Sequence, residues 1–273
     1  MINQKIGFIG AGKMAQAMVE GIIHSNKNSR GNIMASAATE TTLQTVHRSF
    51  GIFTTLDNRK VAKFADILIL AVKPDLHSQI ISEIADSVNE NATIVTIAAG
   101  ITLRDLETLF GRKIKAVRAM PNTPSFVGEG MSVLCANEQL SEAEKAVVEE
   151  LFQTFGKTEW LEEKQMDAVP AISGSSPAYV YMFIEALADG GVRQGLPREK
   201  AYRLAAQAVR GAAKMILETD AHPGKLKDDV CTPGGATIEA VAELEQHQFR
   251  GAILAAMESC TKKVKSMSEL DVQ

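Results

Sequence analysis

GFIGAGKMAQA, residues 7–17, decides the fold of this chain. The stretch joins an apolar run with the character of a buried strand to a segment in which apolar residues recur at helical spacing. Gly10, Gly12 and Ala15 form the pattern G-x-G-x-x-A, which in this strand–turn–helix context predicts a dinucleotide-binding turn. Gly10 permits the tight turn, Gly12 lets a pyrophosphate approach the backbone, and Ala15 lets helix and strand pack closely. The alternative is an ordinary turn between a strand and a helix.

Short apolar runs alternate with helical patterns over the first 160 residues. Such alternation is typical of an α/β Rossmann domain, a doubly wound and mainly parallel sheet with helices on both faces. The expected strands lie at 5–10, 32–37, 66–72, 92–99, 113–120 and 131–136, with an edge strand at 157–162. The expected helices follow the first glycine turn and lie near 39–49, 75–88, 102–110 and 141–154.

The pattern changes after residue 163. Strand-like alternation does not return, and Ala and Gly become frequent, as in EALADGGVRQGL (185–196). Because small residues at helical spacing let helices approach closely, this half is predicted to be all-helical and to pack against a second copy of itself. We therefore expect a dinucleotide-binding Rossmann domain at 1–163 and an all-helical substrate and dimerisation domain at 164–273.

Composition places the chain among ordinary globular proteins. Its 273 residues suffice for two domains, and apolar residues make up 45% and charged residues 23% of them. The net charge is −4 with both signs spread along the chain, which disfavours binding to nucleic acid or to a membrane surface. The longest apolar run, 65–72, is too short to span a bilayer, and the first residues lack the features of a signal peptide.

Cysteine and histidine usage indicates neither disulfides nor a metal site. The cysteines are widely spaced and form no Cys-x-x-Cys pair: Cys135, Cys231 and Cys260. Reduced thiols in a cytoplasmic protein are therefore expected. Surface or capping positions are expected for the histidines, which show no metal-ligand spacing: His24, His47, His77, His222 and His247.

The end of the second expected strand bears on the choice of cofactor. Sites selective for NAD usually place Asp or Glu there to hold the ribose 2′-hydroxyl. Here no carboxylate occurs until Glu40, whereas the hydroxyls of Ser36 and Thr39 suit a 2′-phosphate. This favours NADPH, with NADH as the alternative, and the sequence does not place Arg48 or Arg59 relative to the site.

Two further loops follow expected strands, at the edge of the sheet where this fold class binds ligands. AVKP (71–74) and AAG (98–100) are both expected to line the cofactor. Proline and glycine also end strands for purely local reasons, which is the alternative. In AMPNTP (119–124), Asn122 and Thr123 either form a rigid turn between two prolines or lie beside the nicotinamide.

A second glycine turn stands near the end of the chain, in CTPGGATIEAVAELE (231–245). Helical spacing begins near Ile238, so the turn lies at the entry to a helix, which Thr237 caps in the simplest interpretation. A cap does not require Gly234 and Gly235, however, and their unobstructed N–H groups suit a bound anion. Because the first turn accounts for the pyrophosphate, we expect a small carboxylate here.

Together these motifs resemble the pyrroline-5-carboxylate reductase family, which catalyses the last step of proline synthesis. Besides the two glycine turns, the resemblance rests on AVKP, AAG, AMPNTP, ISGSSPAY (172–179) and DGGVRQGLPREKA (189–201), in the same order. It implies a Rossmann domain followed by a helical domain of the 6-phosphogluconate dehydrogenase type, which interlocks in a homodimer and allows a higher oligomer such as a decamer. It also implies NAD(P)H-dependent reduction of 1-pyrroline-5-carboxylate to L-proline.

The resemblance also implies site residues, position by position. The cofactor contacts would fall on Gly10, Ala11, Gly12, Lys13, Met14, Ala15, Ser36, Asn58, Ala71, Val72, Lys73, Pro74, Ala98, Ala99, Gly100 and Asn122. The substrate loop would comprise Thr232, Gly234, Gly235, Ala236 and Thr237. Thr237 matches the threonine whose hydroxyl lies near the ring nitrogen and serves the catalytic step, and no metal is implied. Small departures from the family pattern, which bear on affinity more than on reaction type, occur at Ser176, Asp220, Cys231 and Thr232.

Two other functions remain open at this point. Another enzyme of the same two-domain architecture, such as a 3-hydroxyacid dehydrogenase or an imine reductase for a different substrate, would keep the dinucleotide turn. Hydroxyacid oxidation needs a general base, and the lysines of the helical half lack the glycine-rich flanks which that family uses. A non-catalytic dinucleotide-binding regulator would have no need of the second glycine turn.

Overall fold

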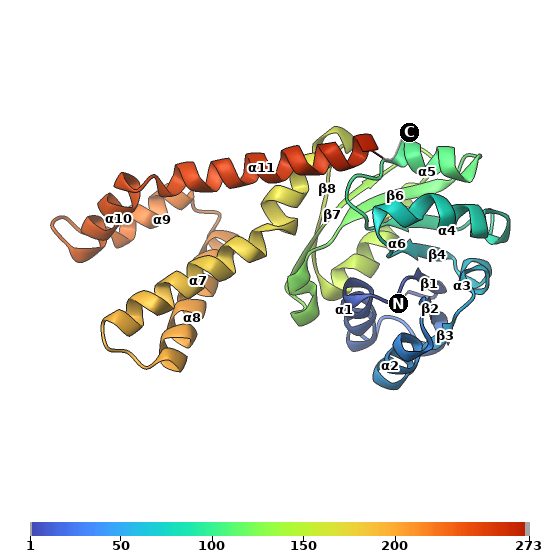
Figure 1. Cartoon of the computed structure of the whole chain (residues 1–273), viewed down its shortest axis with the longest axis horizontal. Coiled ribbons are helices and arrows are strands. Elements are labelled where there is room, and N and C mark those ends of the chain that lie inside the picture. The colour runs from blue at the N-terminus through green and yellow to red at the C-terminus, as the bar shows by residue number, and fades with distance from the viewer. Residues whose placement is uncertain (1, 271–273) are drawn as a thin grey trace. The chain divides into compact units, whose positions relative to one another are not determined.

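A computed structural model describes residues 2–270 of the chain (Figure 1). The chain divides into two compact units, of which the first comprises the residues up to Ser175 together with those from Cys260 onward. The second unit is Ser176–Ser259. Within the described residues, all strands belong to the first unit and the second unit is helical.

The described part of the first unit contains one eight-stranded sheet. Its strands are β1 (Ile6–Ile9), β2 (Ile33–Ser36), β3 (Phe53–Thr55), β4 (Ile67–Leu70), β5 (Thr93–Thr96), β6 (Lys115–Met120), β7 (Gly130–Ala136) and β8 (Gly156–Trp160). Their order is β3-β2-β1-β4-β5-β6-β7-β8, and all neighbours are parallel except β6 and β7. Because β1 lies between β2 and β4, the winding direction reverses at β1, which confirms the doubly wound, mainly parallel Rossmann sheet.

Both edges of the sheet are informative. β8 pairs only with β7 and forms one edge, as expected for 157–162. The other edge is β3, which the sequence pattern does not predict because three residues are too few to show an alternation of apolar and polar side chains. The helix that follows β3 is not predicted either. It starts where the Asp57 side chain accepts a hydrogen bond from the Arg59 N–H, a local cap that precedes only two turns of helix.

Helices cover both faces of the sheet (Figure 1). Those between the strands are α1 (Lys13–His24), α2 (Glu40–Phe50), α3 (Asn58–Phe64), α4 (His77–Ile84), α5 (Leu103–Phe110) and α6 (Glu142–Phe152). Side chains of α1, α2 and α6 share one core cluster with Phe8 and Ile69. Side chains of α3, α4 and α5 share another with Ile9 and Leu70. Because adjacent residues of a strand point to opposite faces, the two clusters lie on the two sides of the sheet.

Residues 163–175 pack on the sheet, although the sequence pattern assigns most of them to the helical domain. Met166 and Val169 are buried in the same cluster as α3, α4 and α5. The buried guanidinium of Arg118, on β6, donates to the carboxylate of Asp167 over 2.6 Å, which satisfies its charge. The compact units therefore do not coincide with the predicted domain ranges, whose boundary after residue 163 stays a prediction.

The second unit consists of long helices joined by short turns. The helices are α7 (Ser176–Arg193), α8 (Arg198–Thr219), α9 (Pro223–Val230), α10 (Ala236–Gln246) and α11 (Phe249–Leu270), and α11 continues into the first unit. Close approach through small residues occurs as expected, since a Cβ added to Gly191 would lie 3.3 Å from the Cβ of Ala201. Among the described residues, no helix combines the length and the apolar character that crossing a bilayer requires.

Candidate functional site

The turn after β1 is held between the ends of its two neighbouring strands. The Gly10 N–H donates to the Ser36 carbonyl over 3.2 Å, and the Ala71 N–H donates to the Ile9 carbonyl over 2.8 Å. Gly10 has a φ of +94°, and a Cβ there would lie 2.6 Å from the Ala71 carbonyl oxygen. Both the left-handed backbone and the close approach require glycine, as the sequence pattern predicts for this position.

Gly12 is the N-cap of α1, and its environment suits a bound anion. No side chain in the described part of the chain caps this helix, so N–H groups of its first turn have no capping partner from the protein. A Cβ added to Gly12 would meet no described atom within 4 Å, so there is open space beside this cap. Ala15 is buried where α1 packs on the sheet. The donors, the space and the helix dipole fit the diphosphate of a dinucleotide.

The end of β2 forms a polar chain that sequence reasoning could not anticipate. Ser36 is fully buried, and its hydroxyl donates to the side-chain oxygen of Asn58 over 2.7 Å. The Asn58 amide nitrogen in turn donates to Glu83 over 3.0 Å. In this arrangement Ser36 and Asn58 position the end of β2 and the start of α3, and direct donation from Ser36 to a 2′-phosphate stays a prediction.

The same series of hydrogen bonds shows which of Arg48 and Arg59 lies near the end of β2. Because Asn58 is bonded to Ser36, the first turn of α3, with exposed Arg59, lies beside the end of β2. The N-terminal end of α2 follows β2, whereas Arg48 lies in the last turn of α2, at the other end of the helix. Of these two cations, Arg59 is therefore the one near the expected ribose position.

The loops at 71–74 and 98–100 are joined by a buried histidine. His77 is 1% exposed, so the expectation of a surface position is wrong for this residue, although its backbone is the C-cap of the short turn Pro74–Leu76. One imidazole nitrogen, Nδ1, lies 3.1 Å from the Lys73 carbonyl oxygen, and Nε2 lies 2.9 Å from the Thr96 hydroxyl. That hydroxyl accepts a hydrogen bond from the Ala98 N–H over 3.2 Å. By contrast His222 does cap a helix, since its side chain accepts from the Gly224 N–H at the start of α9.

Asn122 holds the turn that follows β6. Its side-chain oxygen accepts from the Met131 N–H over 2.8 Å, and its amide nitrogen donates to the Ser173 carbonyl over 2.9 Å. The side chain is 8% exposed. Both ends of the amide are thus engaged within the first unit, which supports the turn interpretation, while contact with a nicotinamide stays a prediction.

The second glycine turn, in the helical unit, joins α9 to α10. Gly234 has a φ of +67°, and a Cβ there would meet no described atom within 4 Å. Gly235 donates its N–H to the Thr232 carbonyl over 3.0 Å, and a Cβ there would lie 2.3 Å from the Thr232 hydroxyl oxygen. Gly234 is therefore required by the backbone conformation, and Gly235 by the close approach of Thr232.

The cap of α10 is Gly235 and not Thr237, which corrects the simplest interpretation of the sequence. Helical hydrogen bonding starts at Ala236, so Thr237 is the second residue of the helix. No described side chain caps α10, and the Thr237 side chain is partly exposed. A helix start without a capping side chain, which follows two glycines, again suits an anion.

Comparison with known families accounts for both units. Residues 163–267 match a family model described as "Pyrroline-5-carboxylate reductase dimerisation", and residues 5–100 match one described as "NADP oxidoreductase coenzyme F420-dependent".

Individual relatives match over nearly the whole chain. A pyrroline-5-carboxylate reductase from Escherichia coli is 45% identical over 98% of this chain and 100% of its own length, and one from Arabidopsis thaliana is 42% identical over 97% and 96%. A crystal structure of the Plasmodium falciparum pyrroline carboxylate reductase with NADP bound has a TM-score of 0.89. It is 34% identical and covers 98% of this chain and 99% of its own.

Proposed function

Because this chain belongs to the pyrroline-5-carboxylate reductase family, we propose that it reduces 1-pyrroline-5-carboxylate to L-proline with NADPH, NADH being the alternative cofactor. One pyrroline-5-carboxylate, one NADPH and one proton would give one L-proline and one NADP⁺. The observation that carries the proposal is the second glycine turn, where α10 begins without a capping side chain among the described residues. A dinucleotide-binding turn alone would serve many reductases, whereas a second anion-accepting turn calls for a substrate with its own negative charge.

The first glycine turn would hold the dinucleotide through its backbone. The N–H groups at the start of α1 would bind the diphosphate, and the open space at Gly12 supports this role. Residues 71–74 and 98–100 would line the rest of the cofactor, while Ser36 and Asn58 would position the ribose end. When bound, the cofactor supplies the hydride.

The second glycine turn would hold the substrate carboxylate. The N–H groups of Gly234, Gly235 and Ala236, at the positive end of α10, would donate to its oxygens. Thr232 would shape the turn through its contact with Gly235. The Thr237 hydroxyl, which does not cap the helix, would form a hydrogen bond with the ring nitrogen.

Reduction requires that a hydride reach the imine carbon and that the ring nitrogen end as an amine. A protonated C=N group is the better electrophile because its positive charge attracts the hydride. Threonine is a weak acid, so the proton would come from solvent and Thr237 would orient the nitrogen. Positioning of two reactants can lower a barrier by roughly 7–11 kcal/mol, so binding by the two glycine turns would account for most of the acceleration.

The assembly would be a homodimer through the helical domain, with a decamer as a candidate for the higher oligomer. The match to a dimerisation family over residues 163–267 supports the dimer. A cytoplasmic location, and the absence of nucleic-acid and membrane partners, stay predictions from the sequence.

Thr237→Ala tests the assignment of the second turn. We expect a fall in kcat of about 10- to 1000-fold, the order found when one transition-state hydrogen-bond donor is removed. Thr237→Ser is the matched control, because it keeps the hydroxyl and should retain most of the activity. The measurement is NADPH consumption with 1-pyrroline-5-carboxylate, alongside NADP reduction with 3-hydroxyacids.

Two results would count against the proposal in different ways. Activity of Thr237→Ala within twofold of the wild type would remove Thr237 from the site but leave the reaction in place. A wild-type protein that binds NADPH yet does not reduce 1-pyrroline-5-carboxylate would overturn the reaction itself. Hydroxyacid oxidation in that case would point to the dehydrogenase alternative.

A further inference from the structure

We propose that His77 is a positioning residue for the cofactor, because its imidazole ties the loop at 71–74 to the loop at 98–100 and so holds both in the conformation that receives NADPH. The inference rests on the proposed function, which assigns these two loops to the dinucleotide. His77 itself is not among the residues that the family resemblance places in the site.

The chemistry of the contacts fixes the direction of each hydrogen bond. A carbonyl oxygen only accepts, so Nδ1, 3.1 Å from the Lys73 oxygen, must carry a hydrogen. In a neutral imidazole Nε2 is then an acceptor, and the Thr96 hydroxyl, 2.9 Å away, donates to it. The oxygen of that hydroxyl accepts from the Ala98 N–H over 3.2 Å. The chain from Ala98 through Thr96 and His77 to Lys73 is thus consistently oriented from donor to acceptor.

The position of this series of hydrogen bonds in the fold explains why it would hold both loops together. Thr96 is the last residue of β5 and is fully buried, and Ala98 lies two residues later in the loop after that strand. Lys73 lies in the loop at 71–74 after β4, and its carbonyl also accepts from the Leu76 N–H in the short 3-10 turn that precedes α4. Since β4 and β5 are parallel neighbours, their two loops leave the same edge of the sheet. His77 bridges them by side-chain hydrogen bonds where the backbone ladder of the sheet has ended.

The chemistry of histidine suits this bridge. Its two ring nitrogens provide one hydrogen-bond donor and one acceptor, and the rigid ring loses little conformational entropy when it forms the bridge. Without it, the buried Thr96 hydroxyl would lose its acceptor and the Lys73 carbonyl would keep only the Leu76 N–H, and the two loops could shift independently. Loops whose relative placement is not fixed bind a ligand more weakly, because the loops must then become ordered on binding.

The test compares His77→Leu with His77→Gln in the full-length protein. Leucine fills a similar volume without polar atoms, whereas the glutamine amide again offers one donor and one acceptor. We expect His77→Leu to raise the Kd and the KM for NADPH about 5- to 30-fold, the equivalent of one or two net hydrogen bonds, with kcat and the KM for 1-pyrroline-5-carboxylate changed less than about threefold. His77→Gln should stay within about threefold of the wild type throughout.

Thr96→Val removes the hydroxyl that bonds to His77, and it provides a second test of the inference if His77→Leu folds poorly. It removes the hydroxyl at nearly constant volume, and Thr96→Ser is its matched control. The double variant His77→Leu/Thr96→Val should weaken NADPH binding no more than the stronger single variant, because both break one chain. The Kd is measured by calorimetry, together with the Tm of the apoprotein and its increase on adding NADPH.

Each outcome decides the inference separately from the proposed function. A lower apoprotein Tm with an unchanged Kd for NADPH would make His77 merely structural and overturn the inference, as would a fully additive double variant. Wild-type protein that binds NADPH without reducing the substrate would overturn the reaction, while the Kd values of the variants would still decide the role of His77. Wild-type protein that binds neither NADPH nor NADH would overturn both.

Discussion

Gly10 and Gly12 stand two residues apart in the same turn, yet their environments differ. At Gly10 the backbone is left-handed and the Ala71 carbonyl leaves no room for a Cβ, whereas at Gly12 the φ is −70° and the space is open. Gly10→Ala is therefore expected to lower the free energy of unfolding by about 1–3 kcal/mol. Gly12→Ala should cost less than about 1 kcal/mol, since an N-cap tolerates alanine at modest cost.

Although Gly10→Ala should be the less stable of the two variants, Gly12→Ala should bind NADPH the more weakly. A methyl group at position 12 would stand where the diphosphate approaches, so we expect Gly12→Ala to weaken NADPH binding by at least about tenfold while the protein stays folded. Calorimetric Kd values and thermal melts of both variants make the comparison. Wild-type NADPH affinity in Gly12→Ala would show that the open space at this turn is not used by the dinucleotide.

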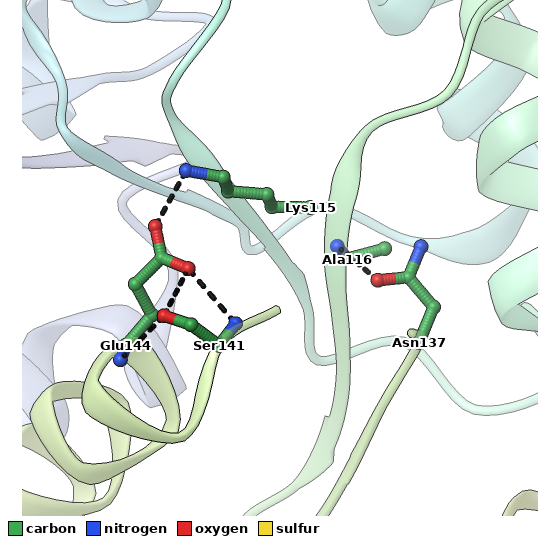
Figure 2. A network of polar contacts seen from close by, with 5 residues as sticks. All are labelled: Lys115, Ala116, Asn137, Ser141 and Glu144. Atoms are coloured by element: carbon green, nitrogen blue, oxygen red, sulfur yellow. Dashed lines mark hydrogen bonds and ion pairs between the residues drawn. The ribbon is translucent and has the colours of Figure 1, made fainter. Parts of the chain in front are cut away.

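At the scale of elements, a polar network joins the start of β6 to the start of α6 (Figure 2). Lys115 donates to Glu144 over 2.5 Å, and Glu144 also accepts from the hydroxyl and the N–H of Ser141. The Ser141 side chain accepts from the Glu144 N–H, which completes a capping box on α6. One carboxylate thus caps a helix and anchors it to a strand.

This network predicts a stability that depends on pH. Burial raises the pKa of Glu144, but the hydrogen bonds from Lys115 and Ser141 and the charge of Lys115 outweigh it and lower the pKa to about 2 from a usual value of 4.5. Because the pKa is lower in the folded state, the contribution is present above pH 4.5 and is lost as the pH falls toward 2. At neutral pH, Glu144→Gln should lower the free energy of unfolding by about 1 kcal/mol, and the difference from wild type should shrink over that acidic range.

The sole tryptophan, Trp160, lies on β8 in the first unit and reports its unfolding in urea by fluorescence. Glu142→Gln is the matched control in the same helical turn, since Glu142 is 88% exposed and pairs only with Lys145 among the contacts described. It should change the free energy of unfolding by less than about 0.5 kcal/mol. A difference between wild type and Glu144→Gln that is equally large at pH 3 and pH 7 would contradict the prediction.

At the scale of the whole molecule, the helical unit leaves large apolar side chains uncovered in a single protomer. Tyr181 and Met182 on α7 are 60% and 69% exposed, and Leu204 and Leu217 on α8 are 61% and 81% exposed. Large apolar side chains exposed along two neighbouring helices favour an interface, and this half of the chain matches a dimerisation family. We therefore expect a dimer or a larger even-numbered oligomer in solution.

Met182→Glu tests whether this surface is buried by a second copy. A carboxylate in an apolar interface is costly, so we expect the dimer dissociation constant to rise by at least about tenfold and monomer to appear at micromolar concentration. Light scattering coupled to size-exclusion chromatography gives the mass. Lys60→Glu, an exposed charge reversal on α3 of the first unit, is the control and should leave the mass unchanged. Equal masses for Met182→Glu and wild type at every concentration would exclude this part of α7 from the interface.

The sequence by itself determined the features that depend on near neighbours along the chain. The glycine turn at 10–15, the alternation of strands and helices, the helical character beyond 176 and the second glycine turn all follow from local patterns, and the structure contains each of them. The resemblance of these motifs to the pyrroline-5-carboxylate reductase family is confirmed by the relatives that match nearly the whole chain.

Only the tertiary structure decided which polar groups meet. Ser36 and Asn58 are 22 residues apart, His77 and Thr96 are 19 apart, and Arg118 is 49 residues from Asp167. No period of 2 or 3.6 relates such positions, because their contact depends on the order of strands in the sheet and on the helices packed over it. The cap of α10 at Gly235, two residues before the expected Thr237, was likewise decided by backbone geometry. Local sequence specifies turns and elements, whereas the hydrogen bonds that hold the candidate site together form only when those elements pack.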